Sequence, residues 1–272
     1  MLSDRRGIGA AIAARLKENA ARLHAEWTLP RPIRHFALDD LLPAEAIRSL
    51  AQRFPPPAAL TLRSSLRERK RVGIDLRRYD PLIGEFLFAF QEPGVLQAVG
   101  EITGLTELEA DPTLYASGIS VMGKGDFLDP HLDNSHDGDG RRYRVLNILF
   151  YVSPGWRWEN GGNLELWDSG IQHAVVIPSH FNRLVVMETH QANWHSVSRV
   201  LVDQPRYCVS NYYFSRISPM GSEYQQVTTF AGRPEQPFKR TLLRLDAVAR
   251  NAAARLLPGY RQRTRHRIRP TS

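Results

Sequence analysis

Residues 143–152, YRVLNILFYV, and residues 206–214, RYCVSNYYF, are two long runs of β-branched and aromatic side chains in the same part of the chain. Shorter runs of the same kind accompany them, and Gly, Pro, Asn or Asp separates each run from the next: LYASGISVM (114–122), NLELWD (163–168), HAVVIP (173–178), RLVVME (183–188) and HSVSRVL (195–201). Short strands with turn residues between them are typical of a β-sandwich or a jelly roll. This part of the chain therefore predicts a mainly β core.

Helical patterns lie on both sides of the β segment. Apolar residues recur at helical spacing in three early stretches, 8–27, 43–54 and 81–102. The last of these is interrupted near Pro93, and a short strand is expected at 33–38. After residue 237 the sequence is again helical in pattern and basic. We expect these helices to support the sheet from outside.

The length and composition of the chain indicate one large domain. With 272 residues, of which 42% are hydrophobic, the chain can bury a substantial core. We expect three parts within that domain: mainly helical support in 1–112, a jelly-roll catalytic core in 113–216, and a C-terminal helix with a basic tail in 217–272. No apolar run approaches the ~20 residues that a membrane-spanning helix needs, and the N-terminus does not resemble a signal peptide. These features predict a cytoplasmic protein without a membrane partner.

The net charge of +8 has a local origin. Five of the positive charges lie in a terminal segment without acidic residues: Arg261, Arg263, Arg265, Arg267 and Arg269. Such a segment is more often a solvated tail than a binding element. The single cysteine, Cys208, excludes an internal disulfide and lies in an apolar run, where we expect a structural role.

Four polar residues suggest a metal centre and an oxidative reaction. His131, Asp133 and His195 can bind one face of a metal and leave the opposite positions open, as non-haem Fe(II) requires for its co-substrate and O2. Arg206 offers a planar fork of donors that matches a carboxylate, as a dicarboxylate such as 2-oxoglutarate requires. Residues 131–142, HLDNSHDGDGRR, form a polar, Gly-containing stretch between strand-like runs, where ligands are often found. The pattern predicts an oxygenase.

Four stretches of the chain resemble the 2-oxoglutarate and Fe(II)-dependent dioxygenases, specifically their prolyl-4-hydroxylase-type branch: HLDNSHDGDGR (131–141), FYVSPGW (150–156), GGNLELW (161–167) and HSVSRVLVDQPRYCVSNYYF (195–214). The resemblance implies a double-stranded β-helix, the cupin-like jelly roll, flanked by N- and C-terminal helices. It also implies Fe(II) as the metal and 2-oxoglutarate and O2 as co-substrates. The implied reaction oxidises an unactivated C–H bond by hydroxylation, ring closure or desaturation, and releases succinate and CO2.

The same resemblance implies a role for each of five residues. His131 and Asp133 match the proximal metal ligands, and His195 matches the distal ligand. Arg206 matches the basic residue that pairs with the distal carboxylate of 2-oxoglutarate. Tyr151 matches a tyrosine whose hydroxyl assists in binding that carboxylate.

Strand alternation extends the predicted pocket beyond these residues. Asn147 shares a strand face with Tyr151, and Tyr212 shares a face with Arg206. We therefore expect Asn147 and Tyr212 to contact the substrate, and Asn134 and Trp194 to lie at the rim of the pocket. Core packing is the alternative for each of these residues.

Differences from related branches bear on the substrate. Prolyl hydroxylases tend to carry a Tyr shortly before the first His, whereas this chain has Met122 and no aromatic residue until Phe127. Halogenating relatives lack the metal carboxylate that Asp133 supplies, and nucleic-acid demethylases carry a second Arg where this chain has Tyr212. We expect a free amino acid or an amino-acid-derived metabolite as substrate, used in biosynthesis, and no nucleic-acid partner.

Three other functions remain open at this point. A peptidyl or protein hydroxylase of the prolyl type would use the same residues on a larger substrate. A zinc hydrolase would use the three metal ligands but would not need Arg206. A non-catalytic jelly-roll binding protein would need neither the three metal ligands nor Arg206. The sequence leaves the oligomeric state, the stereochemistry and the exact substrate undetermined.

Overall fold

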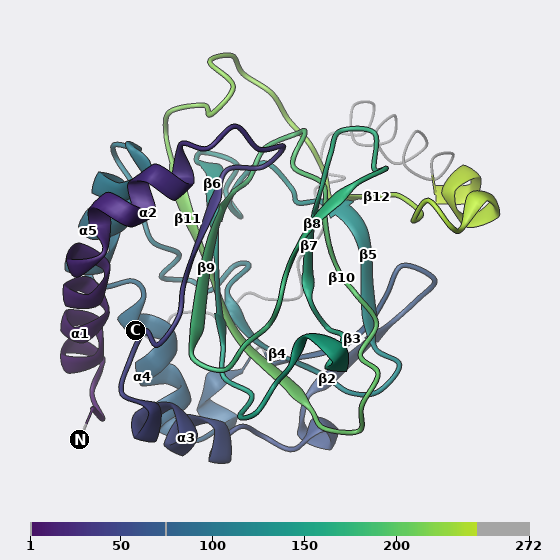
Figure 1. Ribbon diagram of the computed structural model, residues 1–272. Helices are drawn as coiled ribbons and strands as arrows, with labels where there is room; N and C mark the ends of the chain where they lie inside the picture. Colours follow the sequence, from purple (N-terminus) through teal and green to yellow (C-terminus); the bar gives the residue numbers. More distant parts are fainter. Residues whose placement is uncertain (1, 74, 244–272) are drawn as a thin grey trace.

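The computed structural model describes residues 2–73 and 75–243 (Figure 1). Its helices are α1 Arg5–Glu18, α2 Ala20–Trp27, α3 Ala44–Gln52, α4 Pro81–Ala89 and α5 Pro93–Thr103. Its strands are β1 His35–Leu38, β2 Thr61–Ser64, β3 Glu68–Gly73, β4 Gly118–Met122, β5 Phe127–Leu132, β6 Tyr143–Tyr151, β7 Leu164–Trp167, β8 Ala174–Ile177, β9 Arg183–Glu188, β10 His195–Val197, β11 Arg206–Ser215 and β12 Thr229–Phe230.

The strands form one curled antiparallel sheet. Its order is β1-β9-β6-β11-β4-β3-β5-β10-β7-β8, with β2 paired to β3 and β12 paired to β5. Figure 1 shows the sheet folding into two facing layers, with β6, β9 and β11 in one and β5, β7, β8 and β10 in the other. This arrangement is the predicted jelly roll. The sheet also extends beyond the predicted segment 113–216, because β1, β2, β3 and β12 join it.

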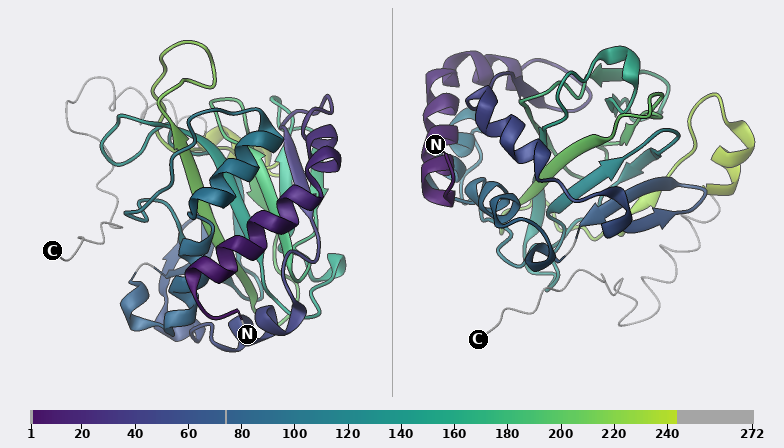
Figure 2. Two further views of the ribbon diagram at one scale, coloured as in Figure 1. Left: turned by 90° about the vertical axis from the view of Figure 1, so that its left-hand side faces the viewer. Right: turned by 90° about the horizontal axis from the view of Figure 1, so that it is seen from below.

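The N-terminal helices cover the outer face of the β6–β9–β11 layer (Figure 2). Alternation along β6 explains the contact. Leu146, Ile148 and Phe150 are buried in one cluster with apolar side chains of α1, α4 and α5. The intervening residues of β6, Asn147, Leu149 and Tyr151, face the space between the two layers. The predicted supporting role of the helices follows from this packing.

The early helices begin and end close to the predicted bounds, with one difference. The stretch 8–27 is two helices rather than one, because the chain breaks at Asn19. The Asn19 side-chain amide donates a hydrogen bond to the carbonyl of Arg15 at 2.9 Å. A short polar side chain that bonds locally to the backbone favours a helix end over a helix interior.

Sequence reasoning missed the hairpin formed by β2 and β3. Its sequence, residues 61–73, is mostly polar and shows no apolar alternation. The strands form because β3 pairs with both β4 and β5, which closes the sheet between its two layers. Tertiary pairing therefore determines this element.

Two further predictions concern the rest of the chain. The predicted C-terminal helix and the basic tail lie largely outside the described residues. No helix in the part of the chain that the structure describes is long and apolar enough to cross a membrane.

Candidate active site

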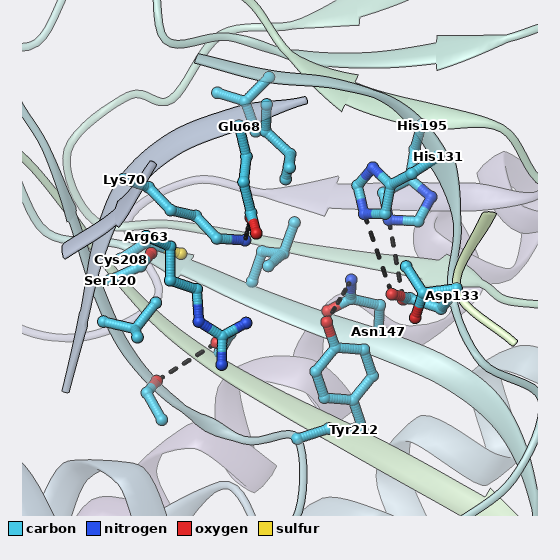
Figure 3. A pocket seen from close by; sticks show the side chains of 18 of the residues that line it. Arg63, Glu68, Lys70, Ser120, His131, Asp133, Asn147, His195, Cys208 and Tyr212 are labelled. Atoms are coloured by element: carbon cyan, nitrogen blue, oxygen red, sulfur yellow. Dashed lines mark hydrogen bonds and ion pairs between the residues drawn. The ribbon is translucent and has the colours of Figure 1, made fainter. Parts of the chain in front are cut away.

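The three predicted metal ligands come together between the two layers of the sheet. His131 of β5 and His195 of β10 are directly paired residues of adjacent antiparallel strands. Asp133 follows the end of β5. The ligating atoms of the three side chains lie within 4.8 Å of one another. Figure 3 shows both imidazole rings directed toward the carboxylate of Asp133.

The donor set of these side chains fits a metal ion. The Nδ1 atoms of His131 and His195 lie 3.0 Å from the backbone carbonyls of Asp129 and Asn193, which leaves each Nε2 directed to the centre. The Nε2 atoms are 3.9 Å (His131) and 3.7 Å (His195) from the Asp133 oxygens, too far for hydrogen bonds. One of these oxygens, Asp133 Oδ2, is buried without a hydrogen-bond partner. A cation bound by all three groups satisfies this atom, and imidazole with carboxylate suits Fe(II).

The protonation states of the ligands favour metal binding. Burial, followed by the adjacent His195, lowers the pKa of His131 to about 3. Burial raises the pKa of Asp133, but the Arg144 guanidinium and the two histidines outweigh it, and the pKa falls to about 2. At neutral pH the site therefore presents a neutral imidazole at His131 and a carboxylate at Asp133.

Arg144 is a buried residue of the site that sequence reasoning missed. Its Nη1 lies 3.2 Å from Asp133 Oδ1, and its guanidinium lies 4.2 Å from the centre of the Tyr212 ring. Simple alternation along β6 places Arg144 on the opposite face from Asn147. The register between β6 and β11 slips at Val145, however, and this bulge turns Arg144 toward the cavity.

Arg206 occupies the floor of the same cavity and is 3% exposed. Its Nε donates to Ser179 Oγ at 3.0 Å, and its guanidinium lies 4.8 Å from the centre of the Tyr151 ring. No acidic side chain among the described residues forms an ion pair with Arg206. A buried guanidinium with only neutral neighbours is well suited to an anionic ligand.

The Gly-Gly pair of the GGNLELW stretch allows this close packing around Arg206. Gly162 has a φ of 64°, and a Cβ added there would lie 2.7 Å from Arg206 Cδ. The carbonyl of Gly162 accepts a hydrogen bond from Ser179 Oγ at 2.8 Å. The indole of Trp156 donates a hydrogen bond to the carbonyl of Gly161 at 3.0 Å, which stabilises the turn that contains Gly161. Local backbone geometry thus holds Arg206 and Ser179 in place.

Tyr151 lies behind Arg206 rather than on the cavity surface. The side chain is fully buried, and its hydroxyl has no hydrogen-bond partner within the described residues. Burial raises the pKa of this hydroxyl well above its usual range, so that it remains a proton donor. Its predicted contact with 2-oxoglutarate stays a prediction.

The other predicted pocket residues divide into two groups. Asn134, Asn147 and Tyr212 line the cavity, and Asn147 Nδ2 lies 3.5 Å from the Tyr212 hydroxyl. Trp194 instead packs against an apolar cluster that includes Trp167, and it does not line the cavity. The reason is its place next to His195, because adjacent residues of an extended chain point to opposite faces.

The β2–β3 hairpin supplies a wall of the cavity that the sequence did not predict. Arg63, Glu68 and Lys70 project from it into the cavity (Figure 3). Lys70 Nζ lies 3.1 Å from Glu68 Oε2. Burial raises the pKa of Glu68, but the charge and hydrogen bond of Lys70 outweigh it and hold the pKa below its usual value.

Burial also raises the pKa of the Cys208 thiol to about 11, which agrees with its predicted structural role.

Known proteins share the motifs and the fold of this chain. The family model of the 2OG-Fe(II) oxygenase superfamily matches residues 117–214. Prolyl 3-hydroxylase OGFOD1 of Mus musculus is 26% identical over 119 residues, which are 42% of this chain and 21% of that protein. The chain thus matches about a fifth of the length of this curated relative.

Two solved structures show the same fold. A prolyl-4-hydroxylase from Pseudomonas putida superposes with a TM-score of 0.53 at 19% identity, covering 73% of this chain and 100% of that one. The non-haem α-ketoglutarate-dependent epimerase SnoN from nogalamycin biosynthesis superposes with a TM-score of 0.51 at 13% identity, covering 80% and 87% of the two chains. The matched segment, residues 117–214, contains the metal triad and Arg206, and over this segment the chain is similar to the 2OG-Fe(II) oxygenase superfamily.

Proposed function

We propose that this protein is a 2-oxoglutarate- and Fe(II)-dependent oxygenase that acts on a free amino acid or an amino-acid-derived metabolite. The observation that carries the proposal is the cavity shared by the metal triad and Arg206, a buried cation with no acidic partner among the described residues. A zinc hydrolase has no use for such a cation, and a non-catalytic binding protein has no use for the triad. A dicarboxylate that chelates the metal and reaches Arg206 uses both the metal triad and the buried arginine.

The protein contributes binding and orientation to this reaction. His131, Asp133 and His195 would hold Fe(II), and Arg206 would bind the distal carboxylate of 2-oxoglutarate. When bound, the iron supplies the oxidation of an unactivated C–H bond by O2, coupled to release of succinate and CO2. Hydroxylation, ring closure and desaturation are all compatible with this chemistry.

Residues around the ligands keep the site in one arrangement. Arg144 binds one oxygen of Asp133 and thereby fixes the carboxylate, while the backbone carbonyls behind the histidines fix the two rings. Ser179 orients the Arg206 fork by accepting a hydrogen bond from its Nε. Such pre-set partners reduce the reorganisation that binding and reaction require.

The size of the cavity supports a small substrate. Its volume is about 340 Å³, at the small end of the range for ligand pockets. That space must hold both 2-oxoglutarate and the reacting part of the substrate. A small, polar metabolite matches a cavity lined by Asn134, Asn147 and Tyr212. The proposal includes no nucleic-acid or membrane partner, and a cytoplasmic location remains a prediction.

A peptidyl or protein hydroxylase is the second candidate. The names of OGFOD1 and of the Pseudomonas putida enzyme favour it. The β2–β3 hairpin also favours it, because β2 is an edge strand within the described residues, and Leu62 of β2 and Leu66 of the following turn are exposed beside the cavity. An extended peptide can add to such an edge.

One experiment separates these candidates. The protein is loaded anaerobically with Fe(II) and 2-oxoglutarate and then incubated in air with a panel of amino acids and metabolites, or with cell-extract proteins. Succinate and product mass are followed. We expect substrate-stimulated succinate in the metabolite arm, with a product that gains one oxygen or loses two hydrogens. Turnover confined to the protein arm would favour the second candidate.

The control is the His131→Ala variant, which removes one metal ligand. We expect it to fold normally and to produce no succinate. Wild-type protein that consumes no 2-oxoglutarate in any arm, even without substrate, would refute the oxygenase proposal.

A further inference from the structure

The cavity carries more positive than negative side chains. Its cationic residues are Arg63, Arg67, Lys70, Arg144 and Arg206, and its acidic residues are Glu68 and Asp133. Fe(II) and 2-oxoglutarate bring equal and opposite formal charges and leave this excess unchanged. A cavity with a positive excess favours an anionic substrate.

Most of these cations already have a partner. Arg144 pairs with Asp133 at 3.2 Å, and Lys70 pairs with Glu68 at 3.1 Å. Arg206 faces the place of the distal carboxylate of 2-oxoglutarate. Arg67 has contacts of its own, one of them with the ring of Phe230 at 5.6 Å. These pairings leave Arg63 as the cation to be explained.

Arg63 is half-buried, and within the described residues its guanidinium forms no hydrogen bond or salt bridge, although its charge helps to lower the pKa of Glu68. It stands opposite Lys70 in the register of the β2–β3 hairpin. Figure 3 shows Arg63 directed into the cavity, on the side away from His131 and His195, with Asn147 and Tyr212 between. The remaining space of the cavity therefore has the metal centre at one end and, at the other, a guanidinium without a hydrogen bond or salt bridge among the described residues.

We infer that Arg63 binds a carboxylate of the substrate. This inference rests on the proposed function and specifies its substrate class. A guanidinium presents two parallel N–H donors that match the two oxygens of a carboxylate, which fixes the orientation of the bound molecule as well as its position. The carboxylate at Arg63 leaves the rest of the molecule to extend past Asn147 and Tyr212 toward the metal.

The inference separates free acids from residues inside a peptide. A free amino acid keeps its α-carboxylate, whereas an internal residue of a peptide has a neutral amide at that position. Arg63 thus discriminates against internal peptide residues, because their neutral amide leaves a half-buried charge without its partner.

The test uses the twenty free L-amino acids and their carboxamides as probes. The Fe(II) and 2-oxoglutarate-loaded protein is assayed for succinate, product mass, kcat and KM. In parallel, the same probes are titrated calorimetrically into the protein loaded with Mn(II) and 2-oxoglutarate, which reports binding without turnover. The variant is Arg63→Gln. The matched control is Arg69→Gln on the same hairpin, because Arg69 is 50% exposed, pairs with Asp126 and does not line the cavity.

We expect an accepted free acid to be bound more tightly than its carboxamide. Arg63→Gln should raise KM and Kd for that acid about 10- to 100-fold, the value of a charged hydrogen-bonded pair. Arg69→Gln should resemble the wild type in every measurement.

Three results would overturn the inference: equal binding of acid and carboxamide by the wild type, an unchanged KM and Kd in Arg63→Gln, or no acid in the panel that binds. Each of these results is compatible with the oxygenase proposal if the protein still consumes 2-oxoglutarate. Conversely, acid binding that requires Arg63 in a protein that consumes no 2-oxoglutarate would support the carboxylate site and refute the oxygenase.

Discussion

Arg206→Gln should weaken 2-oxoglutarate binding without weakening the fold. Arg206 is 3% exposed, and its contacts are neutral: Ser179 Oγ, the Met122 sulfur and the Tyr151 ring. The substitution therefore breaks no ion pair in the ligand-free protein. In the complex it removes one partner of a buried charge pair, which costs about 3 kcal/mol, or about 100-fold in Kd.

The assay is thermal unfolding of the Mn(II)-loaded protein with and without 2-oxoglutarate. At a concentration of about 100 times the wild-type Kd, the ligand stabilises the wild type by about 2.7 kcal/mol and a 100-fold weaker variant by about 0.4 kcal/mol. At about 2 °C per kcal/mol for a domain of this size, Tm rises by about 5 °C in the wild type and by less than about 1 °C in the variant.

Two controls make the result specific. Arg206→Lys keeps the charge but loses the planar fork, and we expect an intermediate shift in Tm. Arg199→Gln, which changes an exposed arginine outside the cavity, should behave as the wild type. A full 2-oxoglutarate shift in Arg206→Gln would refute the assignment of the co-substrate to this end of the cavity. A large loss of stability in its ligand-free form would refute the reasoning about neutral contacts.

Three further predictions concern stability and metal binding. Burial raises the pKa of Glu188, but His190 and Arg34 outweigh this effect and lower the pKa from 4.5 to about 2. The carboxylate therefore stabilises the fold by about 3 kcal/mol above pH 4.5, and this stabilisation is lost as the pH falls toward 2. The difference in unfolding free energy between the wild type and Glu188→Gln should shrink over that range. Phe150→Ala should cost about 3–5 kcal/mol in urea unfolding, because its fully buried ring joins the sheet to the helices. His195→Ala should abolish the rise in Tm that Mn(II) gives the wild type, and a retained rise would contradict its role as a ligand.

The β core and its metal ligands could be predicted because their signals are local. Each strand carries its own alternation and turn residues, and the His131-x-Asp133 spacing puts two ligands within one strand end. His195 and Arg206 follow from motifs that occur in a fixed order along the same strands. The family model matches the same segment, residues 117–214.

The residues that were missed depend on contacts between distant segments. Arg144 faces the cavity because of a bulge in the pairing of β6 with β11, and alternation alone gives the opposite face. Ser179 meets Arg206 only through the packing of a loop against Gly162. Trp194, which is predicted at the rim, packs against the cluster that contains Trp167, and this contact also joins distant segments of the chain.

The sequence by itself predicted the metal triad, the arginine proposed to bind the co-substrate, and the jelly roll that carries them. Only the tertiary structure decided the wall of the cavity opposite the sheet core, because β3 becomes a strand by pairing with β4 and β5, and β2 by pairing with β3, rather than by their own apolar pattern. That pairing brings Arg63, Glu68 and Lys70, all from residues 61–73, into the cavity that contains the metal triad. Local signals specify elements, whereas long-range pairing specifies which side chains share a cavity.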